Sequence, residues 1–151
     1  MRIRKEIIGA AAVIAAVVAA SAFAAPTSPT RQEANGKLTA FLTVNQAIPA
    51  PKGARGTGTF TATVSGNTIK YRLTYKGLTG PAVAAHIHAA LAGKANPAPA
   101  VALCGPCKNG QTGTVTASAA VMKKILGGAT YVNIHTPING GGEIRGQIAS
   151  S

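Results

Sequence analysis

The segment ARGTGTFTATVSGNTIKYRLTYK, residues 54–76, decides the fold class of this chain. Residues 54–64 alternate threonine with small or apolar side chains, and residues 69–76 alternate apolar with mostly basic ones. Successive side chains of a β-strand point to opposite faces, so each half is predicted to be a strand with one buried face. The intervening SGNT, residues 65–68, is a turn sequence and predicts a hairpin.

The second strand of the hairpin determines which face meets solvent. Ile69, Tyr71 and Leu73 lie on its apolar face, and a one-residue shift in register would bury three cations in their place. The register is therefore expected to be firm. The cations that form a basic surface on the outer face of this strand are Lys70, Arg72 and Lys76.

Short β-prone runs separated by glycine, proline and asparagine continue to the C-terminus. One helix is expected over residues 117–126, with Thr116 or Ser118 as its N-cap and Gly127 at its end. Seven or eight short strands with turns at regular spacing predict an all-β antiparallel β-sandwich with this one short helix.

The N-terminus predicts a secretory signal peptide over residues 1–24. Three basic residues precede an Ala-rich apolar run at 7–20, and AFA at 22–24 is a cleavage pattern. The run is too short for a comfortable membrane span, which needs about 20 residues. We therefore expect an exported protein, periplasmic or extracellular, with no transmembrane span after cleavage. A leader segment at 25–35 and a single domain at 36–149 would follow.

The charge balance favours an anionic partner. The chain carries 15 Lys and Arg against 3 Asp and Glu, a net charge of +12 at pH 7. An anionic cell-envelope polymer or another protein is the expected partner, although charges that only maintain solubility are the alternative. Nucleic acid is not expected, because the protein is exported and aromatic residues, which stack on bases, make up only 4% of the chain.

All three histidines lie in predicted strands, AHIH at 85–88 and YVNIHT at 131–136. Side chains at i and i+2 share a strand face, so His86 and His88 point the same way. If His135 joins them, three imidazoles form a donor set for copper or zinc. Copper is favoured because no carboxylate cluster is present for harder ions. The alternative is a polar patch that binds no metal.

Four motifs occur in a fixed order along the chain: LTYKGLTG at 73–80, AAHIH at 84–88, YVNIHT at 131–136 and GGEIRGQ at 141–147. In this order they resemble the CHRD domain, a module named after chordin and common in exported bacterial proteins. The resemblance covers about residues 36–148, and it departs from the family pattern where Ala89-Ala90 replaces a frequent Gly-Pro. It implies an immunoglobulin-like β-barrel or Greek-key β-sandwich with a limited likeness to copper-zinc superoxide dismutases.

Catalysis is not expected. The resemblance implies no agreed activity, and a dismutase zinc half-site cannot be built from three histidines and no aspartate. The sequence contains no recognisable nucleophile-base-acid set. We therefore expect a non-enzymatic binding module, with a copper or zinc protein using His86, His88 and His135 as the alternative.

Three polar residues are expected beside the histidines. Glu143 and Arg145 share a strand face, which predicts an ion pair or a loop brace. In the alternative interpretation Glu143 orients a histidine or supplies an oxygen ligand, as carboxylates behind metal ligands do. Asn133, on the face of His135, would assist by hydrogen bonding.

The two cysteines occur as CGPC, residues 104–107, with the spacing of a thioredoxin active site. A redox dithiol needs a helix N-terminus to lower its thiol pKa, whereas residues 108–113 here predict a loop. A structural disulfide between Cys104 and Cys107 is therefore expected in an oxidising compartment. Copper binding by the thiolates and thiol exchange are the alternatives.

Overall fold

The computed structural model describes residues 35–150. The predicted signal peptide at 1–24 and all but the last residue of the predicted leader at 25–35 lie outside this part. The described elements are β1 (Asn35–Thr43), η1 (Val44–Gln46), β2 (Thr57–Ser65), β3 (Thr68–Lys76), β4 (Ala84–His88), β5 (Pro99–Cys104), β6 (Gln111–Thr116), α1 (Ala119–Leu126), β7 (Tyr131–His135), β8 (Ile144–Gln147) and β9 (Ala149–Ser150).

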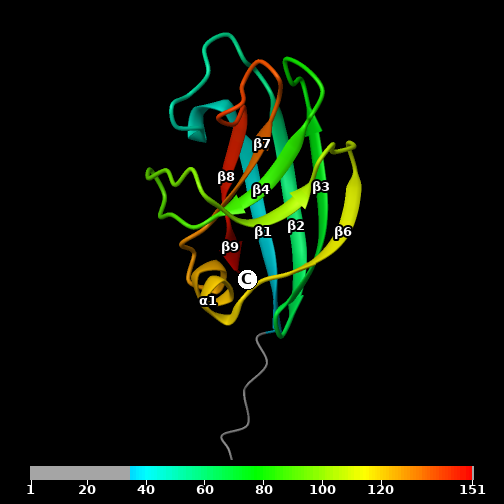
Figure 1. The fold of residues 1–151 in the computed structure, drawn as a ribbon, viewed down its shortest axis with the longest axis vertical. Helices are drawn as coiled ribbons and strands as arrows, with labels where there is room; N and C mark the ends of the chain where they lie inside the picture. The colour runs from blue at the N-terminus through cyan, green and yellow to red at the C-terminus, as the bar shows by residue number, and fades with distance from the viewer. Residues whose placement is uncertain (1–34, 151) are drawn as a thin grey trace, which may run out of the picture. The chain divides into compact units, whose positions relative to one another are not determined.

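The strands form one curled sheet in the order β5-β4-β7-β8-β1-β2-β3-β6, with β9 paired to β1 (Figure 1). All recorded pairings are antiparallel. The edge strands β5 and β6 approach each other, and Tyr71 Oη on β3 donates a 2.6 Å hydrogen bond to the Leu103 carbonyl on β5. The all-β prediction is confirmed, and the expected sandwich takes the form of a single, nearly closed sheet.

The β2–β3 hairpin has the predicted register. Phe60 pairs with Leu73 and Val64 pairs with Ile69, and all four side chains are buried. Burial of each such side chain contributes about 1.5–3 kcal/mol. The threonines of β2 and the cations of β3 point outward, as the alternation predicts.

Helix α1 begins two residues later than the sequence predicts. Ser118 is the N-cap, since its hydroxyl accepts a hydrogen bond from the Val121 amide. Met122 and Ile125 are buried in the core cluster. Strand β6 differs in the other direction. It begins at Gln111, within the predicted loop at 108–113, because it pairs with β3 along six positions.

The core fixes where the histidines point. On β4 and β7, Ala85, Ile87, Val132 and Ile134 face the hydrophobic interior. The alternating residues of these strands therefore lie on the outer face of the sheet, under the loops that cover it. Within residues 35–150 no helix is long and apolar enough to cross a membrane.

Candidate metal centre

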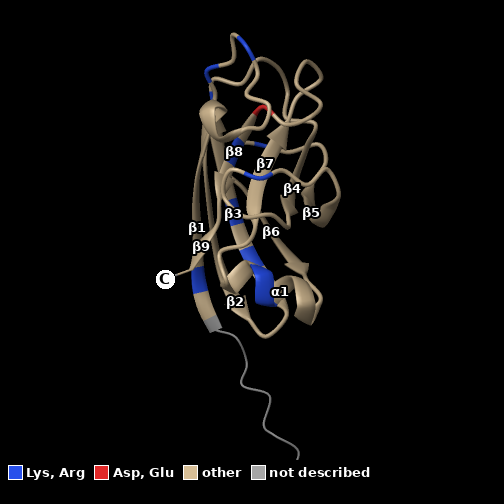
Figure 2. Cartoon of the chain, turned by 90° about the vertical axis from the view of Figure 1, so that its left-hand side faces the viewer, with Lys and Arg blue, Asp and Glu red and all other residues tan. Residues whose placement is uncertain are grey.

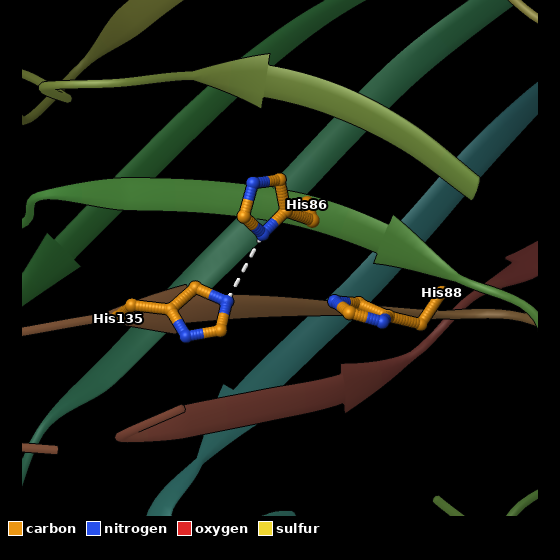
Figure 3. A group of neighbouring side chains, drawn as sticks. All are labelled: His86, His88 and His135. Atoms are coloured by element: carbon orange, nitrogen blue, oxygen red, sulfur yellow. Dashed lines mark hydrogen bonds between the residues drawn. The ribbon is translucent and has the colours of Figure 1, made fainter. Parts of the chain in front are cut away.

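The pairing of β4 with β7 brings the three histidines together. The antiparallel register sets Ala84 opposite His135 and His86 opposite Asn133, which places His86 and His88 along one side of His135. One nitrogen from each ring lies within 4.8 Å of the others. Figure 3 shows the three rings grouped about a common point. The convergence expected from the sequence is therefore present.

Two backbone carbonyls fix the tautomers of His88 and His135. The Nδ1 of His88 lies 2.8 Å from the Asn96 carbonyl oxygen, and the Nδ1 of His135 lies 2.8 Å from that of Gly140. A carbonyl oxygen can only accept a hydrogen bond, so each Nδ1 carries a proton and donates it. The Nε2 atoms of both rings are left with their lone pairs, the form in which imidazole binds a metal.

His86 is the third ring, and it faces the cluster with Nδ1 rather than Nε2. His86 Nδ1 lies 3.1 Å from His135 Nε2. Because that Nε2 is an acceptor, His86 Nδ1 donates the hydrogen bond between them. To bind a metal ion through Nδ1, His86 would take the other neutral tautomer, with its proton on Nε2, which gives a donor set of one Nδ1 and two Nε2 atoms.

Burial favours the neutral form of His86 and His88. Desolvation lowers the pKa of His86 and His88, and the neighbouring charge of His135 lowers both further. Neutral imidazole is the ligand form, so the site needs little deprotonation near pH 7. His88 is 3% exposed, and its Nε2 has no hydrogen-bond partner among the described residues. Buried polar atoms are normally satisfied, so this nitrogen is an open donor directed into the cluster.

An aromatic and cationic stack supports His88. Its ring stacks on Tyr131 with centroids 5.0 Å apart and planes at 6°. The guanidinium carbon of Arg145 lies 3.6 Å from the centroid of the same tyrosine, a cation–π contact. Tyr131 Oη also donates to the Asn96 carbonyl that receives the His88 proton. Arg145 is buried, and desolvation lowers its pKa from the ordinary value.

Glu143 acts as a loop brace. Its carboxylate accepts hydrogen bonds from the Thr79 amide at 2.8 Å, and from the side chains of Thr79, Thr136 and Asn139 at 2.6, 2.7 and 3.0 Å. Burial opposes its ionisation, but these bonds outweigh that effect and lower the pKa of Glu143 below 4.5. In the described part of the chain, no hydrogen bond joins this carboxylate to a histidine and no ion pair joins it to Arg145. The geometry thus supports the loop brace over the ion pair or the direct histidine contact.

Asn133 lies between the histidines and the glycine turn. Burial lowers the pKa of His88, and the neighbouring side chain of Asn133 offsets part of that lowering. Its Oδ1 is a second buried atom without a hydrogen-bond partner in residues 35–150. Gly142 has a φ of 116° and passes close to Asn133. A Cβ at residue 142 would lie 2.8 Å from Asn133 Nδ2, so the position favours glycine.

The remaining sequence-predicted residues lie outside the histidine cluster. Cys104 and Cys107 form a disulfide at the end of β5, so their sulfurs are not free thiolates. No helix begins at this pair, as a thioredoxin-like dithiol requires. Lys70, Arg72 and Lys76 are exposed on β3, which the sheet order separates from β4 and β7.

The sequence did not indicate the carbonyls of Asn96 and Gly140 or the contact of Tyr131 with His88. The carbonyls come from loops, whose backbone course has no residue signature. The position of Tyr131 could have been predicted, because it lies four residues before His135 on the same strand face.

Residues 20–148 match the CHRD domain family, which covers most of the chain. This chain belongs to the CHRD domain family. The predicted resemblance is therefore confirmed, and the histidine cluster lies within the matched part of this CHRD domain. No curated protein and no solved structure is significantly similar to the chain.

Proposed function

We propose that this CHRD domain is an exported binding module that holds one copper ion through His86 Nδ1, His88 Nε2 and His135 Nε2. The observation that carries the proposal is the convergence of three ring nitrogens within 4.8 Å, two of them with tautomers set by backbone carbonyls. The Nε2 of buried His88 also has no hydrogen-bond partner in residues 35–150, which supports a ligand at this atom.

The donor set favours copper over other ions. Imidazole nitrogens suit copper and zinc, whereas calcium and magnesium need oxygen ligands that this cluster lacks. Structural zinc sites are usually closed by four protein ligands, but three are present here. Copper also binds most tightly among the divalent first-row metals for a given nitrogen site. Zinc is the competing ion in the test below.

The proposal is for binding rather than catalysis. The one carboxylate in residues 35–150, Glu143, is fully buried and engaged by Thr79, Thr136 and Asn139, so it is not free to move protons for a substrate. Export is part of the proposal and rests on the signal-peptide pattern at residues 1–24 and on the Cys104–Cys107 disulfide, which suits an oxidising compartment.

The test is the metal content of untagged mature protein, exposed to equimolar copper and zinc and then washed with a mild chelator. We expect one copper per chain by mass spectrometry. His86→Gln, at a half-buried position, should abolish retention without unfolding the domain. Lys70→Gln, on the distant outer face, is the matched control and should retain copper fully.

Two outcomes would refute the proposal. One is the absence of retained copper in the folded wild-type protein. The other is retention that is equal in wild type and His86→Gln, which would place the metal elsewhere. Circular dichroism and thermal melting of each variant separate the loss of metal from the loss of fold.

A further inference from the structure

The outer face of β1, β2, β3 and β6 carries a regular array of hydroxyl and cationic side chains. Pairing across the four strands aligns outward residues in two rows: Lys37–Thr63–Lys70–Thr114 and Thr39–Thr61–Arg72–Thr112. All eight side chains are exposed. Neighbouring strands lie about 4.8 Å apart, so each row presents polar groups at a short, repeating interval.

This face is hollowed along the strands. One shallow depression is lined by both rows, including Lys37, Lys70 and Arg72. A second depression shares Arg72 and continues to Lys76, with Phe41 of β1 on its wall. Together they form a trough, and the strand from Lys70 to Lys76 spans roughly 20 Å at about 3.3 Å per residue. The trough therefore suits an extended chain better than a compact small molecule.

The charge of the trough defines its partner. Four cations line it, namely Lys37, Lys70, Arg72 and Lys76. The one acidic residue in residues 35–150, Glu143, is fully buried and lies in the loop before β8. Figure 2 colours acidic residues red and basic residues blue. The positive field is thus unopposed by any acid on the described surface, and it attracts a polymer of negative charge.

The chemistry of the trough matches a sugar chain. Threonine hydroxyls between the cations can donate to and accept from sugar hydroxyls and carboxylates. Phe41 is 60% exposed and offers an apolar ring to the C–H face of a sugar. A membrane-binding surface would instead present several apolar side chains for insertion beside its cations, and Phe41 is the one large apolar side chain exposed in this trough.

We infer that this trough binds an extended acidic polysaccharide. Carboxylates of the polymer pair with Lys37, Lys70, Arg72 and Lys76, and the threonines hold the sugars between them. The binding is independent of the histidine cluster, so failure of the copper proposal leaves this inference standing.

The probe is alginate, a linear polymer of uronic acids, with dextran as a neutral control. We expect micromolar-range binding to alginate at low salt, a loss of about tenfold or more at 0.5 M salt, and no binding to dextran. Lys37→Gln/Lys70→Gln/Arg72→Gln should bind at least about tenfold more weakly. The control Lys52→Gln/Lys123→Gln/Lys124→Gln removes the same charge from exposed sites outside the trough and should change binding by less than about threefold.

Equal weakening in the two triple variants would overturn the inference, because overall charge would then explain the binding. Tighter binding to vesicles of anionic phospholipid than to alginate would overturn it in favour of a lipid surface. A footprint in the wild-type protein removes dependence on the variants. Bound alginate should protect Lys37 and Lys70 from acetylation while Lys123 and Lys124 stay reactive, and equal protection of all four would contradict the inference.

Discussion

The chemistry of His88 and His135 depends on which nitrogen carries the proton. In both residues a backbone carbonyl holds the proton on Nδ1, which leaves Nε2 as the donor to a metal. The β4 and β7 strands supply the positions of the rings, and the loops supply their tautomers. A three-histidine site thus needs only strand spacing and two well-placed loop carbonyls.

The first prediction concerns the charge of Arg145. This buried guanidinium contacts Tyr131, which stacks on His88, so a fixed positive charge lies near the proposed copper. Such a charge disfavours Cu(II) relative to Cu(I), by an interaction on the order of 1 kcal/mol at an effective dielectric of about 20. Arg145→Gln should therefore lower the copper reduction potential by tens of millivolts, measured by redox titration. Arg72→Gln, on the outer face, is the control, and an unchanged potential in Arg145→Gln would contradict the argument.

The second prediction concerns pH. Burial lowers the pKa of His86 and His88 below 6.5, so both rings stay neutral under mildly acidic conditions. Protons compete with the metal only once the pH approaches these lowered values. Equilibrium dialysis should therefore show a copper affinity that falls on acidification, as protons bind His86 and His88. An affinity that stays unchanged on acidification would contradict a site made of these histidines.

At the level of elements, the loop of residues 136–143 connects the brace to the histidine cluster. The Glu143 carboxylate accepts hydrogen bonds from Thr79, Thr136 and Asn139. The same loop carries the Gly140 carbonyl that orients His135. Glu143 therefore positions a ligand through the loop rather than by touching it. Its effect should appear in both stability and metal affinity.

Glu143→Gln tests this connection. The amide replaces one of the two acceptor oxygens by an NH2 donor, which then faces another donor, so we expect a loss of about 1–3 kcal/mol in the free energy of unfolding. Copper affinity should fall about tenfold. The pKa of Glu143 is lowered on folding, so its stabilisation is present above pH 4.5 and is lost as the pH falls through the folded pKa. The variant should lack this acid-dependent loss in thermal melts.

Thr79→Val provides the graded comparison, because it removes one hydroxyl donor and keeps the carboxylate. Its stability loss should be near 1 kcal/mol, smaller than that of Glu143→Gln. If both variants retained wild-type stability and copper affinity, the brace would have no role.

The next prediction concerns Tyr71 on β3, which bonds the Leu103 carbonyl on β5 where the sheet closes and pairs with Gly113 on β6. Gly113 lies opposite Tyr71, and a Cβ on it would lie 2.6 Å from the tyrosine ring. Gly113→Ala should therefore destabilise the domain by about 1–3 kcal/mol, measured by urea unfolding. The matched control is Gly36→Ala on β1, where a Cβ meets nothing within 4 Å. Equal stability of the two variants would show that β6 shifts freely and that this contact does not define the closure.

The sequence predicted those elements whose signal is local. The alternation in residues 57–76 determines the hairpin and its exposed cations, and Ser118 with Gly127 marks the ends of the helix. The family resemblance allowed a barrel, but the residue pattern alone did not predict how the sheet closes, because closure depends on long-range contacts such as Tyr71 with Leu103. The short strand β9 was also missed, since two residues carry no periodicity.

For the whole molecule, two surfaces of one sheet carry different sets of side chains. The β4–β7 face carries the histidine cluster under loops, and the β1–β2–β3–β6 face carries the basic trough. The sequence predicted the histidine cluster from i, i+2 spacing and the basic surface from alternation. It gave no sign of the depressions or of the participation of Lys37, which depend on the pairing of distant strands.

The central claim is that copper lies between His86, His88 and His135. The most direct test is an anomalous difference map, collected at the copper absorption edge from crystals of the copper-loaded protein. We expect one strong peak about 2.0 Å from His86 Nδ1, His88 Nε2 and His135 Nε2. A map with no peak at this cluster, or with its main peak at another site, would contradict it.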